Sequence, residues 1–410
     1  MNILLINHYA GSPEMGMEFR PYYFAREWTK MGHQVTIIAG DFSHLRMKNP
    51  EVFRDFQRQD LDGIRYCWVK TGTYEGNGLK RALSMFRFVR KLWTHARQIT
   101  KSLKPDVVIA SSTYPLDTYA AQKIAKISGA KLIHEVHDMW PATLYEVGGM
   151  SRWHPFVLLM QMAENSAYRK SDKVVSLPPL AKEYMVKHGM EPTKFIPIPN
   201  GIVEEEWKCG EPLPEEHLRL LEEIKKEKYI VGYFGGHALS NALDILLDVA
   251  KRMDNGKTAF VLVGNGVEKE RLKKRKEAEK IDNVFLLPPI SKKAVPALVS
   301  YFDCIYMGSL DSPLYRFGIC MNKVFDSMMS GKPIVCAITT PISPVGQYQC
   351  GMMVRSGDTD GIIDAVNTIK EMSEEERKQM GENGRNAVLN HFTYTRLAKK
   401  FAELFEENRK

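Results

Sequence analysis

The 410-residue sequence has no C-x-x-C pair among its six cysteines and no low-complexity segment. It also has no apolar run near the roughly 20 residues that a membrane-spanning helix needs, so we expect a chain that does not cross a membrane. A chain of this length needs no disulfide framework, so reduced thiols are expected. The apolar segment at residues 2–7 is too short for a signal-peptide core, and a cytoplasmic location is therefore predicted.

The bulk composition is that of an ordinary globular protein, with 44% hydrophobic, 26% charged and 10% aromatic residues. The length predicts two or three domains. The formal net charge of +8 is modest, so it matters mainly where it is concentrated. Positive charge is concentrated in one stretch, residues 79–104.

Short β-rich runs alternate with helical patterns along nearly the whole chain, which is typical of parallel sheets covered by helices on both faces. We therefore predict an α/β fold with two Rossmann-like doubly wound domains facing across a cleft. A capping box at Ser373–Glu376 predicts one of two helices in the tail. The first half predicts strands near 3–6, 35–39, 64–69, 107–110, 132–136 and 174–176, and helices near 19–30, 79–103, 116–127 and 156–168. The second half predicts strands near 230–234, 259–263, 284–287, 304–306 and 334–336, and helices such as 242–252 and 269–280.

The domain boundary is expected where both periodic patterns fail. A Pro-rich stretch at 195–201 leads into an acidic, loop-like segment at 204–216. We therefore predict a first domain over 1–200, a linker over 201–216 and a second domain over 217–390. The last helix, 391–410, is expected to pack back toward the first domain.

Sites in open parallel sheets lie beyond the carboxyl ends of the strands, so the strand-to-helix loops carry the candidates. The loop at residues 8–16 holds two glycines before a helix that starts near Glu18. Its spacing is not that of a G-x-G-x-x-G dinucleotide site, but a phosphate or sugar could approach its backbone. Gly16 and Arg20 are donor-binding candidates there, and simple turn geometry is the other interpretation of the glycines.

His137 and Asp138 follow the strand predicted at 132–136. An imidazole beside a carboxylate can bind a sugar hydroxyl or support a developing charge, because the carboxylate fixes the tautomer and raises the basicity. A plain loop hydrogen bond is the alternative. His134 and Glu135 lie within the strand and are expected to be structural.

The second domain opens with a strand that runs into Gly235 and Gly236 and then into a helix, with Ser240 or Asn241 expected as its N-cap. Such a loop resembles a phosphate cradle, because the glycines allow close approach and the helix N-terminus favours an anionic diphosphate. A common Gly-Gly turn is the alternative.

A stretch at 312–326 carries Arg316, Lys323 and Asp326 toward Gly331. Lys323 and Asp326 are three residues apart and share one helical face. A lysine there can meet phosphate while the carboxylate accepts hydrogen bonds from two ribose hydroxyls. A surface ion pair between the two is the alternative.

Taken in order, these motifs resemble those of family 4 retaining glycosyltransferases of the GT-B fold, especially the amino-sugar transferases of bacterial surface-polysaccharide clusters. The resemblance covers nearly the whole chain. Its most specific pieces are residues 26–38, 104–106, 137–141, 199–201, 263–266 and 322–333.

The family pattern has two glutamates eight residues apart before the Gly-Lys-Pro element, and Gly318 and Asp326 occupy those positions here. The resemblance implies that Asp326 keeps the ribose role with a shorter arm. The basic pair that follows the glycine loop in the family is absent from residues 238–243, and Arg316 and Lys323 are the expected replacements.

The resemblance implies a hexosyltransferase that moves a sugar, with an N-acetylated amino sugar as a candidate, from a UDP-sugar donor to a lipid-linked or saccharide acceptor. Surface polysaccharide or lipopolysaccharide would be the product. The leaving diphosphate takes the acceptor proton in a reaction with retention, and no metal or other cofactor is expected. Two D-x-D triplets, at residues 60–62 and 358–360, are expected to be structural, the first in a turn and the second at a helix start.

Residues 79–104 contain eight Lys or Arg and no acidic residue. The apolar residues fall mostly at helical spacing on one side, namely Leu83, Phe86, Val89, Leu92, Trp93 and Ala96. A basic amphipathic helix suits an anionic bilayer, which predicts peripheral contact with the inner face of the cytoplasmic membrane. Packing of the same apolar stripe on the sheet is the alternative.

Two other function classes share some of these features. A sugar-nucleotide epimerase has the same architecture but would need acid and base groups on both faces of the sugar carbon. A nucleic-acid-binding protein could use the basic stretch, but the sequence lacks interleaved aromatic motifs and zinc spacings, so no nucleic-acid partner is expected.

Overall fold

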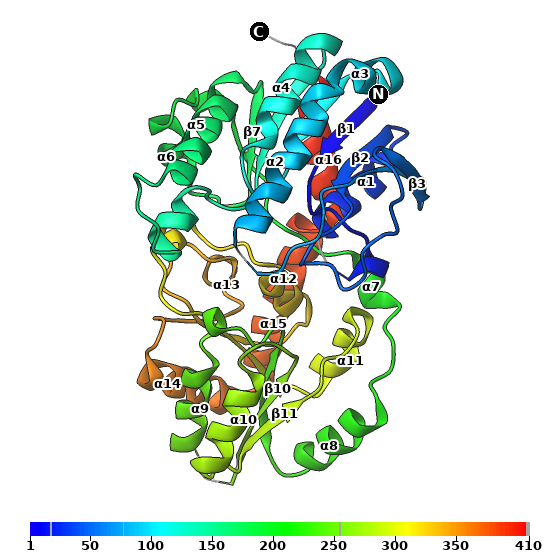
Figure 1. The fold of residues 1–410 in the computed structure, drawn as a ribbon. Helices are drawn as coiled ribbons and strands as arrows, with labels where there is room; N and C mark the ends of the chain where they lie inside the picture. Colours follow the sequence, from blue (N-terminus) through cyan, green and yellow to red (C-terminus); the bar gives the residue numbers. More distant parts are fainter. Residues whose placement is uncertain (17–18, 77, 254–255, 407–410) are drawn as a thin grey trace. The chain divides into compact units, whose positions relative to one another are not determined.

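The computed structural model describes residues 1–16, 19–76, 78–253 and 256–406. They form two compact units, the first made of Met1–Asn200 with Tyr394–Lys410 and the second of Gly201–Thr393. Each unit contains a mainly or wholly parallel sheet covered by helices (Figure 1). The prediction of an α/β fold with two doubly wound domains is confirmed.

The first unit is built on a sheet with the strand order β3-β4-β2-β1-β5-β6-β7-β8. The β3–β4 pair at one edge is antiparallel, and the other neighbours are parallel. β5 and β6 are buried along their whole length, as expected for central strands with helices on both faces. The strands are β1 (Asn2–Ile6), β2 (Gln34–Gly40), β3 (Gln57–Leu61), β4 (Ile64–Val69), β5 (Val107–Ala110), β6 (Lys131–Val136), β7 (Lys173–Ser176) and β8 (Phe195–Pro197).

The helices of the first unit follow the predicted pattern with one clear difference. The long helix expected at 79–103 is two helices that meet at His95. The start expected near Glu18 lies outside the described residues. The helical elements are η1 (Pro13–Met15), α1 (Phe19–Lys30), α2 (Leu79–Thr94), α3 (Ala96–Leu103), α4 (Asp117–Ser128), η2 (Thr143–Val147), α5 (Pro155–Lys170), α6 (Lys182–Lys187), η3 (Pro192–Lys194) and α16 (Tyr394–Glu406).

Helix α2 presents apolar side chains on two sides rather than one. Phe88 and Leu92 are fully buried in the core beneath the sheet. Leu83, Phe86 and Trp93, which we expected on the same side as Leu92, are 43%, 39% and 44% exposed. The difference follows from helix geometry, because residues advance by about 100° around α2, which puts Leu83, Phe86 and Trp93 on one side and Phe88 and Leu92 on the opposite side.

The C-terminal helix α16 belongs to the first unit and packs against α1. The rings of Trp28 and Phe401 lie 5.1 Å apart between their centroids, and the Trp28 indole N–H donates to the carbonyl of Ala398 at 3.1 Å. Both rings are fully buried. The chain thus closes the first unit only with its last described helix.

The second unit has a parallel sheet with the strand order β11-β10-β9-β12-β13-β14. Its strands are β9 (Tyr229–Phe234), β10 (Thr258–Val263), β11 (Val284–Leu287), β12 (Cys304–Gly308), β13 (Ile334–Ala337) and β14 (Gly351–Val354). Its helical elements are α7 (Glu204–Lys208), α8 (Glu215–Lys225), η4 (Leu239–Asn241), α9 (Leu243–Arg252), α10 (Lys269–Ala278), η5 (Lys292–Ala294), α11 (Val295–Ser300), η6 (Pro313–Phe317), α12 (Asn322–Met329), α13 (Pro344–Gln347), α14 (Thr359–Glu371) and α15 (Glu374–His391). The predicted capping box at Ser373 and Glu376 is present at the start of α15.

The segment 201–216 is not the open linker that we expected. It belongs to the second unit and contains the short helix α7. Glutamates occupy its first turn, where negative charge is favourable, and Trp207 packs against two of the hydrophobic clusters of the unit. The first part of a segment that resembled a loop is therefore a short helix, and Trp207 anchors it to the unit.

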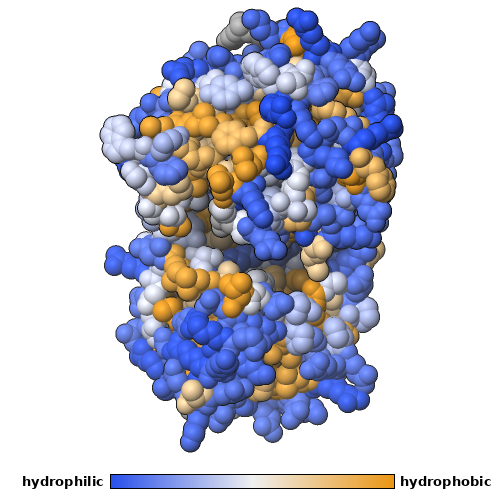
Figure 2. Space-filling view, viewed as in Figure 1, coloured by the Kyte–Doolittle hydropathy of each residue, from blue (hydrophilic) through white to orange (hydrophobic). Residues whose placement is uncertain are grey.

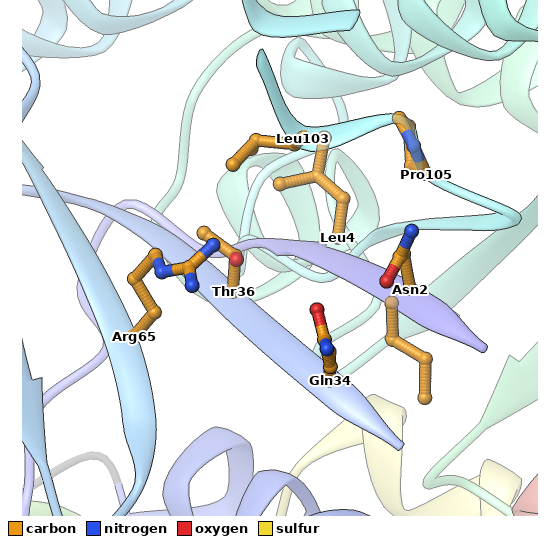
Figure 3. A pocket seen from close by; sticks show the side chains of 8 residues that line it. Asn2, Leu4, Gln34, Thr36, Arg65, Leu103 and Pro105 are labelled. Carbon is orange, nitrogen blue, oxygen red and sulfur yellow. The ribbon is translucent and has the colours of Figure 1, made fainter.

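A small hollow lies at the amino-terminal edge of the first sheet (Figure 3), lined by side chains that include Asn2, Gln34 and Arg65. It holds only about 10 Å³, room for one water at most. Because ligands of parallel sheets bind at the opposite, carboxyl edge, this hollow is not the candidate site.

Candidate functional site

In the first unit, the strand order reverses direction between β1 and β5. β1 has β2 on one side and β5 on the other, so the loops that follow β1 and β5 diverge and leave a crevice at the carboxyl edge of the sheet. Asn7 follows β1, Ser111 follows β5 and His137 follows β6. Three neighbouring strands thus deliver polar side chains to the place where a doubly wound sheet binds its ligand.

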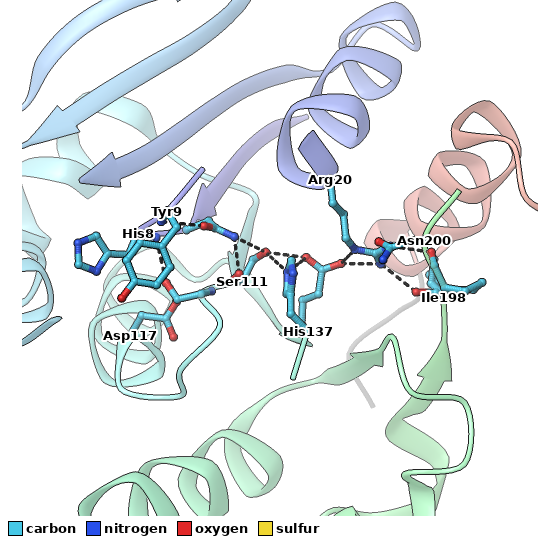
Figure 4. Close-up of polar contacts among 12 residues, drawn as sticks. His8, Tyr9, Arg20, Ser111, Asp117, His137, Ile198 and Asn200 are labelled. Atoms are coloured by element: carbon cyan, nitrogen blue, oxygen red, sulfur yellow. Dashed lines mark hydrogen bonds and ion pairs between the residues drawn. The ribbon is translucent and has the colours of Figure 1, made fainter. Parts of the chain in front are cut away.

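These side chains form one hydrogen-bonded network (Figure 4). The Ser111 hydroxyl donates to Glu135 Oε2 at 2.6 Å, and His137 Nε2 lies 3.0 Å from Ser111 Oγ and 3.2 Å from the same Glu135 oxygen. The Asn7 amide donates to the carbonyl of Ser111 at 2.5 Å. The His137 side chain is 9% exposed, so its ring is held at the edge of the buried network.

Arg20 reaches this network from α1. Its Nε and Nη2 donate to Glu135 Oε1 at 3.0 and 2.9 Å, and its other donors reach the carbonyls of Ile198 and Pro199 at 2.9 and 2.6 Å. The side chains of Arg20 and Glu135 are 5% and 2% exposed. Burial would raise the pKa of Glu135, but Arg20, His137 and Ser111 outweigh burial and hold it well below its usual range.

This arrangement corrects the pairing predicted for His137. The carboxylate bonded to the imidazole is Glu135, which we expected to be structural, and not Asp138. Strand residues two apart lie on the same face, so Glu135 and His137 point the same way, whereas Asp138 is exposed on the other side. His134, which we expected to be structural, is buried, and burial lowers its pKa to about 4.

Gly16 has a conformational reason to be glycine. It ends η1 with a φ of 92°, and a Cβ there would lie 2.7 Å from the Met47 side chain. Its donor-binding role stays a prediction, as do the roles of Arg20 and Asp138.

In the second unit, the corresponding reversal lies between β9 and β12. The glycine loop after β9 is braced by the loop after β10, because Gly235 N–H donates to Val263 O at 3.0 Å and His237 N–H donates to Asn265 O at 2.8 Å. A Cβ on Gly264 would lie 1.9 Å from the carbonyl oxygen of Gly235. The glycines at 264 and 266 thus serve close backbone packing behind the candidate phosphate loop.

Lys323 is joined to the glycine loop through Asn241. Its Nζ donates to Asn241 Oδ1 at 2.5 Å and lies 3.4 Å from the carbonyl of Gly308, and the Asn241 amide donates to the carbonyl of Gly236 at 2.7 Å. Burial lowers the pKa of Lys323 to about 8. Gly236 and Lys323 are therefore brought together, as an anion site requires.

The same contacts correct the predicted N-cap of α9. The cap is Ala242, with a φ of 50°, and neither Ser240 nor Asn241 caps the helix by its side chain. The Asn241 side chain is committed to Gly236 and Lys323 instead.

Asp326 lies one turn along α12 from Lys323 and meets a different set of groups. Burial raises its pKa, Lys292 and the Trp207 side chain oppose the rise, and Glu206 adds to it. Lys292 itself pairs with Glu206 at 3.2 Å. Lys323 and Asp326 form no ion pair with each other in the part of the chain that the structure describes, so the surface-pair alternative fails.

Arg316 is exposed on η6. Its guanidinium donates to the carbonyl of Pro313 at 2.5 Å and stacks 4.2 Å from the centre of the Phe317 ring. Its contact with donor phosphate stays a prediction.

Across residues 1–16, 19–76, 78–253 and 256–406, no group of three His, Cys, Asp or Glu side chains is placed to hold a metal ion. The D-x-D triplets lie where we predicted, the first at a turn and the second at a helix start. Asp62 lies in the β3–β4 turn with a φ of 54°, and Asp358 is the N-cap of α14, accepting from Gly361 N–H at 2.9 Å. Within the same described ranges, no helix is long and apolar enough to span a bilayer.

Comparison with known proteins decides the family. The model of Glycosyltransferase Family 4 matches residues 15–206, and that of Glycosyl transferases group 1 matches residues 216–387. The chain is a family 4 glycosyltransferase. As a glycosyltransferase of the GT-B fold, it is an enzyme, and the predicted family and enzyme class are confirmed.

The relatives of this family 4 glycosyltransferase are distant in sequence. One is a glycosyl transferase provisionally named for colanic acid biosynthesis, WcaI of Escherichia coli K12, with 22% identity over 68% of the chain and 69% of WcaI. Among solved structures, HepE of Anabaena in complex with UDP and glucose has 16% identity and a TM-score of 0.68, with full coverage of both chains. WaaG, a glycosyltransferase involved in lipopolysaccharide biosynthesis, has 13% identity and a TM-score of 0.67, with 99% of this chain and 100% of that chain covered.

Sequence reasoning missed Ser111 and Glu135 in the first unit and Asn241 as a bridging residue in the second. Two signals could have found the first pair. Glu135 stands two residues before His137 at a strand end, and Ser111 directly follows the neighbouring parallel strand. Nothing in the sequence marked Asn241 beyond its candidacy as an N-cap.

Proposed function

We propose that this family 4 glycosyltransferase transfers a sugar from a UDP-sugar to a lipid-linked or saccharide acceptor in the assembly of a surface polysaccharide or lipopolysaccharide. The observation that carries the proposal is the contact of Lys323 with the glycine loop through Asn241, which places an ammonium group beside the backbone proposed to hold the diphosphate. The complex of HepE with UDP and the biosynthetic roles named for WcaI and WaaG support the donor and the pathway class.

The proposed reaction proceeds with retention and needs no metal or other cofactor. Charge develops on the leaving diphosphate as the bond to the sugar breaks, and a lysine ammonium and backbone N–H groups are suited to stabilise it. The acceptor oxygen forms the new bond to the anomeric carbon of the sugar, and its proton passes to an oxygen of the leaving diphosphate. Asp326 would hold the ribose hydroxyls, Gly235 and Arg316 would contribute to the diphosphate site, and His137 would contact the sugar.

The donor is tested by hydrolysis of a panel of UDP-, GDP- and dTDP-sugars, including N-acetylated amino sugars. We expect one UDP-sugar to be hydrolysed at least tenfold faster than the others, with unchanged rates in EDTA and with the anomeric configuration retained by NMR. Asp326→Ala is expected to weaken UDP binding, and His137→Ala to slow turnover. A rate abolished by EDTA, or an inverted product, would refute the corresponding part of the mechanism.

We further propose that the acceptor is met at an anionic membrane on the cytoplasmic side, through the exposed side of α2. Leu79, Leu83 and Phe86 are 77%, 43% and 39% exposed there, and α5 carries the exposed Leu158 and Met162. Figure 2 shows apolar side chains gathered on the face of the first unit that carries α2 and α5, with hydrophilic residues beside them. Apolar side chains next to lysines and arginines fit a bilayer of anionic lipid.

Vesicle sedimentation tests this surface. We expect the protein to bind vesicles of phosphatidylglycerol, less so vesicles of phosphatidylcholine, and to be released by high salt. Leu83→Glu with Phe86→Glu should reduce binding at least tenfold. The matched control is Ile127→Glu, because Ile127 is equally exposed, at 42%, but lies on α4. Equal loss in both variants would refute a specific role for α2.

A further inference from the structure

The hydrogen bonds around His137 fit only one placement of the protons on Glu135, Ser111 and His137. Glu135 accepts two hydrogen bonds from Arg20 at Oε1, and at Oε2 it accepts one from Ser111. A carboxylate that receives an arginine and a serine in this way is ionised and can only accept. The low pKa of Glu135 supports the same state.

The Ser111 hydroxyl has a single hydrogen, and the 2.6 Å contact commits it to Glu135. The lone pairs of Ser111 Oγ therefore face the other neighbours, among them His137 Nε2 at 3.0 Å. Nε2 is within hydrogen-bond distance of that oxygen and of the carboxylate at 3.2 Å, and both of these can only accept from it. Nε2 must carry the proton.

We propose that Ser111, Glu135 and Arg20 are positioning residues that hold His137 in the tautomer with hydrogen on Nε2, so that Nδ1 is the acceptor presented to a sugar hydroxyl. The sugar part rests on the proposed function, whereas the tautomer does not. In the described residues Nδ1 has no hydrogen-bond partner, which leaves its lone pair available to a ligand.

Arg20 has a second task in this arrangement. Its remaining donors bind the carbonyls of Ile198 and Pro199, just after β8. The guanidinium therefore ties Glu135 to the segment after β8. Because Glu135 is bonded to His137, this contact also restricts the position of the imidazole. Lysine cannot replace it, because a single ammonium cannot make the planar set of contacts.

Direct observation of the ring nitrogens tests the tautomer without any enzymatic assay. In protein labelled with ¹⁵N-histidine, the His137 signals are assigned by their loss in His137→Ala. We expect a protonated Nε2 and an unprotonated Nδ1 in the wild type. In Glu135→Gln, the amide can donate to Nε2, so the population should shift toward hydrogen on Nδ1. The charged or titratable groups nearby are Glu135, Arg20, Asp117, Asp138 and His134, so spectra are compared from pH 6 to 9.

Kinetics test the positioning role. We expect Glu135→Gln to lower kcat by on the order of tenfold to a hundredfold on the donor identified by the panel, with little change in KM. In the His137→Ala background the same substitution should cost nothing more, because Glu135 acts through His137. Glu27→Gln is the matched control. Glu27 is a buried, ion-paired acid on the same helix as Arg20, and among the described contacts none joins it to His137.

The outcomes separate the two proposals. An unprotonated Nε2, a ring doubly protonated up to pH 9, or additive losses in the double variant would overturn the positioning role. The expected tautomer in a protein that turns over no UDP-sugar would refute the proposed function and leave the tautomer intact. If Glu135→Gln does not fold, Ser111→Ala takes its place, and Ser111→Thr, which keeps the hydroxyl, should restore the rate.

Discussion

The lysine at the glycine loop gives the most direct test of the nucleotide site, because its protonation can be controlled by pH. Lys323 is mostly buried and its pKa is lowered to about 8, whereas an ordinary lysine stays charged to about 10.4. An uncharged amine attracts a diphosphate far less than an ammonium does. UDP binding should therefore weaken over a pH range in which surface lysines do not titrate.

The size of the effect follows from the protonated fraction. With a pKa of about 8, about nine tenths of Lys323 is charged at pH 7 and about one tenth at pH 9. If only the charged form binds, the Kd for UDP rises about tenfold between these values, equivalent to about 1.4 kcal/mol. The phosphates of UDP are already ionised over this range, because their last pKa is near 6.

Isothermal titration calorimetry with UDP at pH 7, 8 and 9 measures this dependence. Lys323→Met should bind UDP on the order of tenfold to a hundredfold more weakly at pH 7 and lose the pH dependence, since a charged hydrogen bond contributes about 1.5–3 kcal/mol. The control is Lys251→Met, which removes an exposed lysine paired with Glu279 in the same unit. A constant Kd from pH 7 to 9 in the wild type, or the same slope in Lys323→Met, would refute the assignment of Lys323 to the diphosphate.

Three further predictions concern stability and the glycine loop. Phe401→Ala should destabilise the first unit by about 3–5 kcal/mol, measured by chemical unfolding, because a fully buried ring between α16 and α1 is lost; a cost below 1 kcal/mol would contradict that packing. Burial raises the pKa of Glu164 to about 8, so the folded state favours its protonated form and loses stability as pH rises from about 4 to 8. Glu164→Gln should therefore make Tm less dependent on pH across this window, and an unchanged profile would count against it. Gly264→Ala should weaken UDP binding at least tenfold, because its Cβ would collide with the carbonyl of Gly235, and calorimetry that shows wild-type affinity would disprove the bracing role of that loop.

The architecture of two doubly wound domains was predictable because it depends on local patterns. Strands such as Val284–Leu287 and the helix Phe19–Lys30 begin and end where the apolar periodicity does. Strand β3 was missed because its sequence, Gln57–Leu61, is polar, which an exposed edge strand tolerates.

Only some residues of the candidate site could be predicted from the sequence, because the others depend on contacts between distant segments. His137, Gly235 and Lys323 stand in loops after strands, where position alone suggests chemistry. Glu135 and Ser111 were hidden because their importance depends on which strands are neighbours, and that is a property of the sheet rather than of any one segment. The role of Asn241 depends on a side chain 82 positions farther along the chain.

Because α16 completes the core of the first unit, this unit can finish folding only late in synthesis. Residues 394–406 emerge from a ribosome only after the whole of residues 201–393, so the rings of Trp28 and Phe24 lack their packing partner while the second unit is synthesised. A truncated product that stops before Tyr394 would leave the Trp28 and Phe24 rings exposed to solvent and would be prone to aggregate. The first unit expressed by itself would therefore need the distant helix spliced back on, for instance by a short connection from Asn200 to Tyr394.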